Sequence, residues 1–152
     1  MTESPNFSTD LTGQTAFITG TTSGLGRRFA EVLASCGANV AVAGRRVDRL
    51  EELAEHLKNA DGKVLPVPLD VTDTEALFAS VEKVEQELGP IQILVNNAGK
   101  PDAQLALKMD PKFVDEMVAT NLTSLFHLAS EVTRRLIEAE LPGRIVNIAS
   151  GA

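Results

Sequence analysis

The residues best placed to bind a ligand form a glycine-rich segment near the amino terminus. The run Thr19-Gly20-Thr21-Thr22-Ser23-Gly24-Leu25-Gly26 follows a short apolar run and opens an amphipathic stretch with helical spacing. Amides at the start of a helix bind phosphate oxygens, so this context predicts a nucleotide-binding turn. A turn with a purely structural role is the alternative.

Each glycine of this turn has a predicted role. Gly20 permits the tight exit from the strand, Gly24 lets the backbone approach a pyrophosphate, and Gly26 lets the helix pack closely on the strand. The hydroxyls of Thr22 and Ser23, together with the amides at the helix start, including that of Leu25, would hold phosphate oxygens.

Two arginines follow the second apolar run, which ends Ala43-Gly44-Arg45-Arg46. An NAD-binding chain is expected to offer an acidic side chain there. Arginine in the first turn of a helix opposes the helix dipole at about 0.3–1 kcal/mol. A cofactor 2′-phosphate would justify that cost, since guanidinium groups hold phosphate through charge-assisted hydrogen bonds. We predict NADP(H), with Arg45 as the main contact and Arg46 stacking or secondary. The alternatives are NAD(H), or a solvated basic pair that balances Glu51 and Glu52.

Polar residues mark the later segments as well. Asp70-Val71 ends the third apolar run, and Asn96-Asn97-Ala98-Gly99 ends the fourth. Local explanations exist for both: Asp70 can cap the next helix, and the asparagines can form a turn. Asn121 lies by spacing on the inner stripe of a long helix, where an unsatisfied amide would cost about 1–3 kcal/mol, so it can also be a satisfied core group. Ser150 follows the last apolar run, where a serine beside glycine is commonly a turn residue.

Short β-branched runs alternate with helical patterns, which indicates an α/β fold with a parallel sheet. The predicted strands share apolar composition and flanking turn residues. They are Gln14–Thr19, Asn39–Ala43, Lys63–Leu69, Ile91–Asn96 and Arg144–Ala149. The third contains Pro66 and Pro68, so we place it at a sheet edge, with the missing donors outward and Leu65, Val67 and Leu69 pairing inward. Right-handed crossovers then give the doubly wound Rossmann-like order 3-2-1-4-5.

Helix signals complete this outline. Thr72 with Glu75 reads as a capping box for the third helix, and Asp110-Pro111 starts a fourth that extends almost to Glu140. The predicted inner stripe of the fourth helix comprises Val114, Val118, Asn121, Leu125, Leu128, Val132 and Leu136. Apolar residues off that stripe, namely Phe113, Met117 and Phe126, suggest a second buried face.

Composition limits the function classes. The 152 residues are 43% hydrophobic, enough for one domain, which we place at residues 10–152 after a mobile arm at 1–9. A net charge of −7 disfavours nucleic-acid and anionic membrane partners. Cys36 lies with Leu25, Phe29, Val32 and Leu33 on the predicted apolar stripe of the first helix, as a small core residue. The polar, acidic start and the lack of a long apolar run predict a cytoplasmic protein. Two distant histidines and one buried cysteine do not make a ligand set, so we expect no metal site.

The chain resembles the short-chain dehydrogenases/reductases. Its glycine spacing is that of the family's Thr-Gly-x-x-x-Gly-x-Gly motif, and the later motifs follow in the family's order, from about Leu11 to the last residue, ending in a strand like the one that leads to its catalytic serine. The resemblance implies hydride transfer between NAD(P)(H) and a carbonyl or alcohol. It implies a small-molecule substrate and a homo-dimer or tetramer formed through the long helix Pro111–Ala139.

The resemblance also implies roles for single residues. Asp70 would accept a hydrogen bond from the adenine amino group, with the Val71 backbone beside it. Asn97, Ala98 and Gly99 would line the adenosine ribose and approach the nicotinamide. Ser150 would hydrogen-bond the substrate oxygen, and Asn121 would anchor a water of the proton relay.

One part of the family pattern is missing. The family's hydride chemistry needs a tyrosine acid/base beside a lysine, and the sequence contains no tyrosine. We therefore expect an amino-terminal portion, truncated after the fifth strand and inactive by itself. The alternative is a non-catalytic nucleotide-binding or interaction module. His56 and His127 read as ordinary residues, and Lys100 as solvated.

Overall fold

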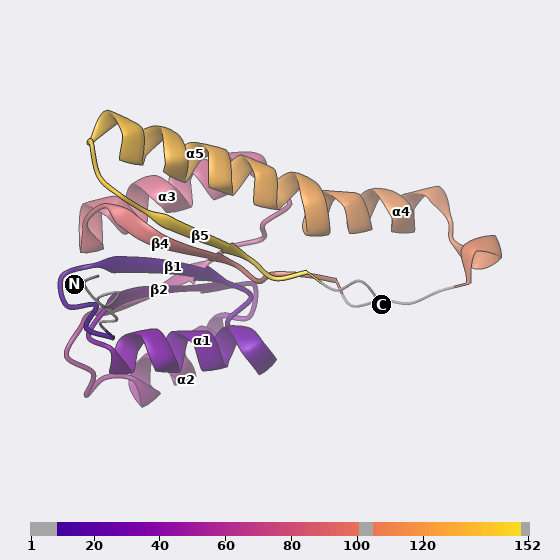
Figure 1. The fold of residues 1–152 in the computed structure, drawn as a ribbon. Coiled ribbons are helices and arrows are strands. Elements are labelled where there is room, and N and C mark those ends of the chain that lie inside the picture. Colours follow the sequence, from indigo (N-terminus) through magenta and orange to yellow (C-terminus); the bar gives the residue numbers. More distant parts are fainter. Residues whose placement is uncertain (1–8, 101–104, 150–152) are drawn as a thin grey trace, which may run out of the picture.

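A five-stranded sheet covered by helices on both faces makes up the computed structural model, which describes residues 9–100 and 105–149 (Figure 1). The predicted arm lies almost wholly outside the described residues. The strands are β1 (Thr15–Thr19), β2 (Asn39–Gly44), β3 (Val64–Pro68), β4 (Ile91–Asn96) and β5 (Arg144–Asn147). The helices are α1 (Gly24–Ser35), α2 (Val47–His56), α3 (Thr74–Leu88), η1 (Ala106–Lys108), α4 (Pro111–Val118), η2 (Ala119–Thr123) and α5 (Ser124–Glu138).

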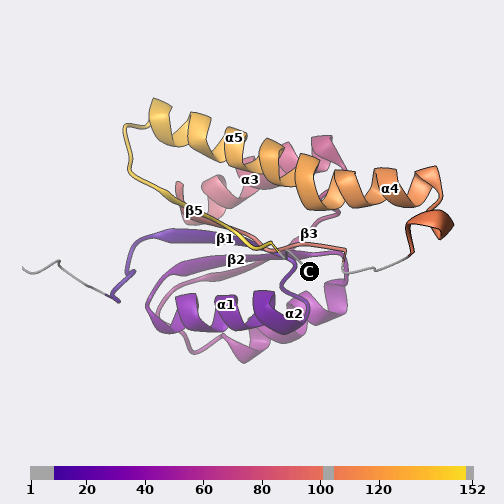
Figure 2. The ribbon, with the colours of Figure 1, turned by 45° about the vertical axis from the view of Figure 1, so that its right-hand side comes forward.

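The strands are all parallel and lie in the order β3-β2-β1-β4-β5, which confirms the predicted doubly wound α/β fold. Helices α1 and α2 cover one face of the sheet, and α3 and α5 cover the other, while α4 precedes α5 and projects beyond the end of the sheet (Figures 1 and 2). Because successive strand residues point to opposite faces, Phe17 packs into the core beneath α3 and α5, and Ile18 into the core beneath α1 and α2.

Strand β3 is an edge strand, as its prolines predicted. The Leu69 amide donates to the Gly44 carbonyl at 2.9 Å, and the Lys63 carbonyl accepts from the Val40 amide at 2.8 Å. The odd-numbered residues therefore pair with β2, and Pro66 and Pro68 occupy outward positions, where no ladder donor is needed.

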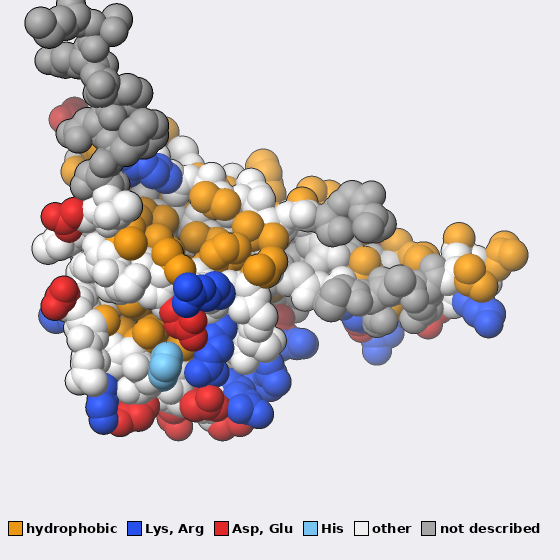
Figure 3. Space-filling model, turned by 60° about the horizontal axis from the view of Figure 1, so that its bottom comes forward, with side chains coloured by type: hydrophobic (Ala, Val, Ile, Leu, Met, Phe, Trp, Pro, Cys, Tyr) orange, Lys and Arg blue, Asp and Glu red, His pale blue; other side chains and the backbone are white. Residues whose placement is uncertain are grey.

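Helix α1 packs through smaller residues than predicted. Gly26, Ala30 and Ala34 are its buried residues, whereas Leu25 and Val32 are exposed. Cys36 is half-buried at the carboxyl end of the helix, so the predicted core stripe is wrong in these members. A close approach of α1 to the sheet requires small side chains, which explains why glycine and alanine occupy the buried positions of this helix. On the outer surface of this layer basic and acidic side chains are interleaved (Figure 3), and the Arg27–Glu52 pair at 3.0 Å joins α1 to α2.

The N-cap of helix α3 lies one residue later than predicted, at Asp73. The Asp73 carboxylate accepts from the Ala76 amide at 3.0 Å and caps the helix. Thr72 instead donates its hydroxyl to Asp70, so the predicted capping box is wrong.

The long helical segment contains a π-turn that the sequence pattern did not reveal. It begins at Pro111 as predicted, with Asp110 as its cap, and continues through η2 to Glu138. The wider turn shifts the register of the helix, so the predicted inner stripe holds only after it, at Leu128, Val132 and Leu136. Before it, Phe113 is buried while Val114 and Val118 are exposed, the reverse of the prediction.

Candidate nucleotide-binding site

The carboxyl ends of β1 and β4 meet at the glycine turn. In open parallel sheets, ligands bind in the crevice at this place, where the strand order reverses. Gly20 has a φ of 71°, in the left-handed region that glycine adopts without strain. At Gly26 a Cβ would overlap the Gly20 carbonyl oxygen and the Asn97 side chain. The predicted close packing at this turn therefore has a direct geometric basis.

Thr19 and Thr21, for which the sequence predicted no role, fix the glycine turn in place. Thr19 Oγ1 accepts hydrogen bonds from the amides of Asn97 at 3.1 Å and Ala98 at 3.0 Å. Thr21 Oγ1 and the Thr21 amide both donate to the Ala43 carbonyl. The turn is thus tied to β4 on one side and to β2 on the other. The only signal in the sequence was their place beside Gly20, because their partners lie far away along the chain.

Asn97 completes this connection. Its side-chain Nδ2 donates to the carbonyls of Thr19 at 3.0 Å and Gly20 at 3.1 Å. The amide group therefore holds the exit of β1 against the end of β4. Asn97, Ala98 and Gly99 lie together at the end of β4, beside the glycine turn.

The amino end of α1 borders open space. Ser23 is the N-cap, but its side chain makes no capping hydrogen bond, and a Cβ at Gly24 would meet no atom within 4 Å. The first amides of α1 lack partners within the helix, and the space over Gly24 is open. Backbone donors at a helix start beside open space are the chemistry that a phosphate requires.

Arg45, Arg46 and Asp70 lie at the carboxyl ends of β2 and β3. The Arg46 guanidinium Nη2 donates to Thr22 Oγ1 at 2.8 Å, while the Arg45 side chain is exposed. Asp70 Oδ1 accepts from the amide and hydroxyl of Thr72, at 3.0 and 2.7 Å. These two hydrogen bonds, and then the charge of Arg45, hold the pKa of the Asp70 carboxyl below its ordinary value. Asp70 therefore stays ionised and keeps its acceptors at neutral pH, with Val71 half-buried beside it.

Asn121 lies in the π-turn and is exposed, so its predicted place in the core is wrong. Its Oδ1 accepts from the Lys100 amide at 2.9 Å, and its Nδ2 donates to the Lys100 carbonyl at 3.4 Å. Asn121 thereby ties the segment after β4 to the long helix, close to Gly99.

Lys100 is also not simply solvated. Its Nζ pairs with Glu116 at 2.6 Å and lies 4.9 Å from the centroid of the Phe113 ring. These contacts hold the partly exposed side chain against α4, in addition to the solvation that was predicted for it.

Ser150 lies outside the described residues. The chain leading to it follows β4, because Ile148 donates its amide to the Asn96 carbonyl at 2.9 Å. Asn96 Nδ2 also donates to Asn147 Oδ1 at 2.9 Å, which joins the ends of β4 and β5.

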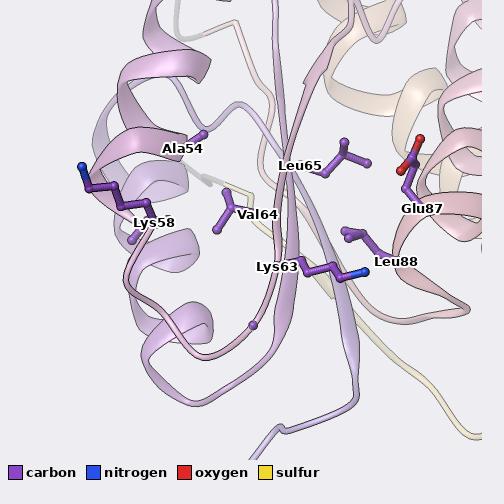
Figure 4. Close-up of a pocket in the computed structure, with 9 residues that line it drawn as sticks. Ala54, Lys58, Lys63, Val64, Leu65, Glu87 and Leu88 are labelled. Atoms are coloured by element: carbon purple, nitrogen blue, oxygen red, sulfur yellow. The ribbon is translucent and has the colours of Figure 1, made fainter.

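A hollow of about 500 Å³ lies at the opposite end of the sheet, near the start of β3 (Figure 4). Val64 and Leu65 point to opposite sides of β3 there, with Lys58 near one and Glu87 near the other. It is far from the glycine turn and brings together no predicted site residue. Among residues 9–100 and 105–149, no three His, Cys, Asp or Glu side chains are grouped to hold a metal ion, and no helix is long and apolar enough to cross a membrane.

Sequence comparisons relate the chain to oxidoreductases. Residues 14–152 match the family model described as short chain dehydrogenase. The chain is 36% identical to a 3-oxoacyl-acyl-carrier-protein reductase of Haemophilus influenzae, covering 92% of this chain and 56% of that protein. It is 34% identical to a gluconate 5-dehydrogenase of Gluconobacter oxydans, covering 92% of this chain and 54% of that protein.

Solved structures show the same likeness. A short-chain type dehydrogenase/reductase from Mycobacterium marinum superposes with a TM-score of 0.88 at 36% identity, over 93% of this chain and 57% of that one. The chain spans a little over half the length of these relatives.

Proposed function

The chain belongs to the short-chain dehydrogenase/reductase family, and on that premise we propose that it is the cofactor-binding part of an NADP(H)-dependent oxidoreductase that interconverts a carbonyl and an alcohol. One observation carries this proposal. Thr19, Thr21 and Asn97 hold the glycine turn open between β2 and β4, with uncapped helix amides at one side and two arginines at the other.

Different residues of the site would contact different parts of the cofactor. The turn from Gly20 to Gly26, with Thr22, Ser23 and Leu25, would receive the diphosphate. Asp70 and Val71 would hold the adenine, and Asn97, Ala98 and Gly99 the ribose and the approach to the nicotinamide. Arg45, which is exposed and lies near Asp70, would be the main contact to the 2′-phosphate, with Arg46 secondary.

Arg45→Ala tests the choice of cofactor. We expect the ratio of NADPH to NADH affinity to fall about tenfold, because the guanidinium pairs only with the 2′-phosphate. Arg49→Ala is the matched control, since Arg49 is an exposed arginine of α2 that pairs with Glu52. Titrating both reduced cofactors into wild type and the two variants measures the ratio. An unchanged ratio in Arg45→Ala rules out Arg45 as the main contact to the 2′-phosphate, and a wild type that does not prefer NADPH rules out the assignment to NADP(H).

The bound nicotinamide would supply or accept the hydride. Ser150 would donate a hydrogen bond to the substrate oxygen as charge develops on it. Asn121 would anchor a water of the proton relay, and its hydrogen bonds to Lys100 support a fixed position for the amide.

The second candidate function is a non-catalytic nucleotide-binding or interaction module with the same fold. The reductase and the module differ in whether the protein converts a carbonyl substrate. The protein encoded by the complete coding sequence is purified and mixed with NADPH and, in turn, a keto-acyl thioester, a keto sugar and a steroid ketone, and the loss of reduced nicotinamide is followed. Oxidation that depends on the carbonyl compound supports the reductase. Tight cofactor binding without oxidation supports the module.

We further propose a cytoplasmic homo-dimer or tetramer that associates through the helix Pro111–Ala139. Four exposed apolar side chains support that surface, at intervals of four residues. They are Val114, Val118, Leu122 and Phe126. Phe126 is 67% exposed, which is unusual for an aromatic residue on an isolated surface.

A further inference from the structure

The glycine turn has no charged residue of its own between Thr19 and Gly26. A cation from another loop contacts it. The Arg46 guanidinium Nη2 lies 2.8 Å from Thr22 Oγ1, 3.4 Å from the Thr22 carbonyl and 3.5 Å from Ser23 Oγ. A positive group is thus placed on the middle of the turn by hydrogen bonds to acceptors of the turn itself.

Thr22 is held in place by the sheet. A Cβ at Gly44 would lie 2.7 Å from the Thr22 Cγ2 methyl, so the methyl group packs against the last residue of β2. The end of the second strand is where nucleotide-binding sheets meet the ribose. The methyl of Thr22 thus contacts β2, while its hydroxyl points to Arg46.

The two arginines make different contacts. Arg45 is exposed, and its charge helps to lower the pKa of Asp70, while the Arg46 guanidinium donates to Thr22 on the glycine turn. Of the two, Arg46 is the one that hydrogen bonds hold in place beside the turn. An arginine already held by hydrogen bonds loses less conformational freedom when it binds a ligand than one that is free in solvent.

We infer that Thr22 is a positioning residue for cofactor choice: its hydroxyl holds the Arg46 guanidinium where a 2′-phosphate would arrive. This rests on the proposed NADP(H) dependence. It gives Arg46 a defined place beside Arg45 and gives the Thr22 hydroxyl a role through the arginine, in addition to any contact with phosphate.

Three substitutions of Thr22 separate the effect of its hydroxyl on cofactor binding from the effect of its methyl group. Thr22→Val keeps the methyl contact with Gly44 and removes the hydroxyl, Thr22→Ser does the opposite, and Thr22→Ala removes both. We expect Thr22→Val to weaken NADPH binding about five- to tenfold more than NADH binding, because NADH loses only the contact of the hydroxyl with the diphosphate that both cofactors share. Thr22→Ser should retain the NADPH preference of wild type. If Thr22→Val does not fold, Thr22→Ala replaces it in the same comparison.

A double-mutant cycle tests whether Thr22 acts through Arg46. Arg46→Ala should lower NADPH affinity, and adding Thr22→Val to it should have little further effect. Dissociation constants for NADPH and NADH are measured on the purified protein, with Arg49→Ala as the control for loss of a nearby positive charge. Additive effects of the two changes, or equal weakening of NADPH and NADH by Thr22→Val, would overturn the inference.

Failure of the proposed NADP(H) dependence can be distinguished from failure of the inference about Thr22. If wild type does not prefer NADPH, the NADP(H) assignment is wrong and the inference falls with it. In another outcome, wild type prefers NADPH and Arg45→Ala reduces that preference, while Thr22→Val and Arg46→Ala leave it unchanged. The NADP(H) assignment is then retained, and only the inference about Thr22 is wrong.

Discussion

At the scale of single residues, the crevice depends on hydroxyl and amide groups that hold backbone rather than ligand. Thr19 is buried, and its hydroxyl satisfies two amides at the end of β4. A buried donor without a partner costs about 1–3 kcal/mol. The shape of the crevice is therefore maintained by groups that need never touch the cofactor.

Thr19→Val tests this view. Valine has nearly the same shape but cannot accept from Asn97 and Ala98, so we expect a loss of about 2 kcal/mol in the free energy of unfolding and weaker cofactor binding. Thr15→Val is the control. Thr15 is buried in the same strand, but its hydroxyl donates to the Leu88 carbonyl at the far end of β1. Denaturant unfolding and cofactor titration should show a smaller loss, about 1 kcal/mol, and unchanged binding for the control. Equal effects of the two changes on binding would contradict the role of Thr19.

The sequence predicted the glycines of the turn better than its threonines. The conformation of Gly20 and the packing at Gly26 follow from the lack of a side chain, which is a local property. The partners of Thr19 are 78 and 79 residues away, so no local pattern identifies them. The roles of Arg45 and Asp70 toward a cofactor remain predictions.

At the scale of elements, the strands were predictable and the long helix only in part. Parallel strands buried on both faces appear as continuous apolar runs, and the prolines of β3 identified the edge. The stripe on the long helix assumed 3.6 residues per turn throughout. The π-turn at η2 breaks that period, which is why Phe113 is buried, and Val114 and Asn121 are exposed.

Ion pairs also join elements, and one has a defined pH dependence. Hydrogen bonds from Arg134 and then Arg135 lower the pKa of Glu131 to about 2, and Arg135 reaches Glu85 on α3 at 3.0 Å. The folded pKa lies below the ordinary 4.5, so the stabilisation is complete above pH 4.5 and is lost as pH falls toward 2.

Glu131→Gln should remove this contribution. We expect it to lower the free energy of unfolding by about 1 kcal/mol at neutral pH, and the difference from wild type to shrink below pH 4.5. Glu138→Gln is the control, since Glu138 is more exposed and pairs with Arg134 on the same helix. Urea unfolding at several pH values measures both. A difference that stays constant down to pH 2 would contradict the assignment.

At the scale of the whole molecule, the exposed apolar side chains of α4, η2 and α5 set the expected state of association. Leu122→Glu and Phe126→Glu should each shift the protein toward monomer, because a charge cannot be buried against apolar side chains without a partner. Val32→Glu is the control, as Val32 is an exposed apolar residue of α1 in the other helical layer. Sedimentation velocity compares the variants. A monomeric wild type would rule out this surface as the oligomer interface.

The outward prolines of β3 make the two edges of the sheet unequal in their capacity to pair with a further strand. A strand from another molecule that approached this side would find no amide hydrogen at Pro66 or Pro68 and could not continue a ladder. Recruitment of foreign strands is thus disfavoured at the β3 edge of the described sheet. Misassembly of this fold through its backbone is accordingly expected at β5 rather than at β3.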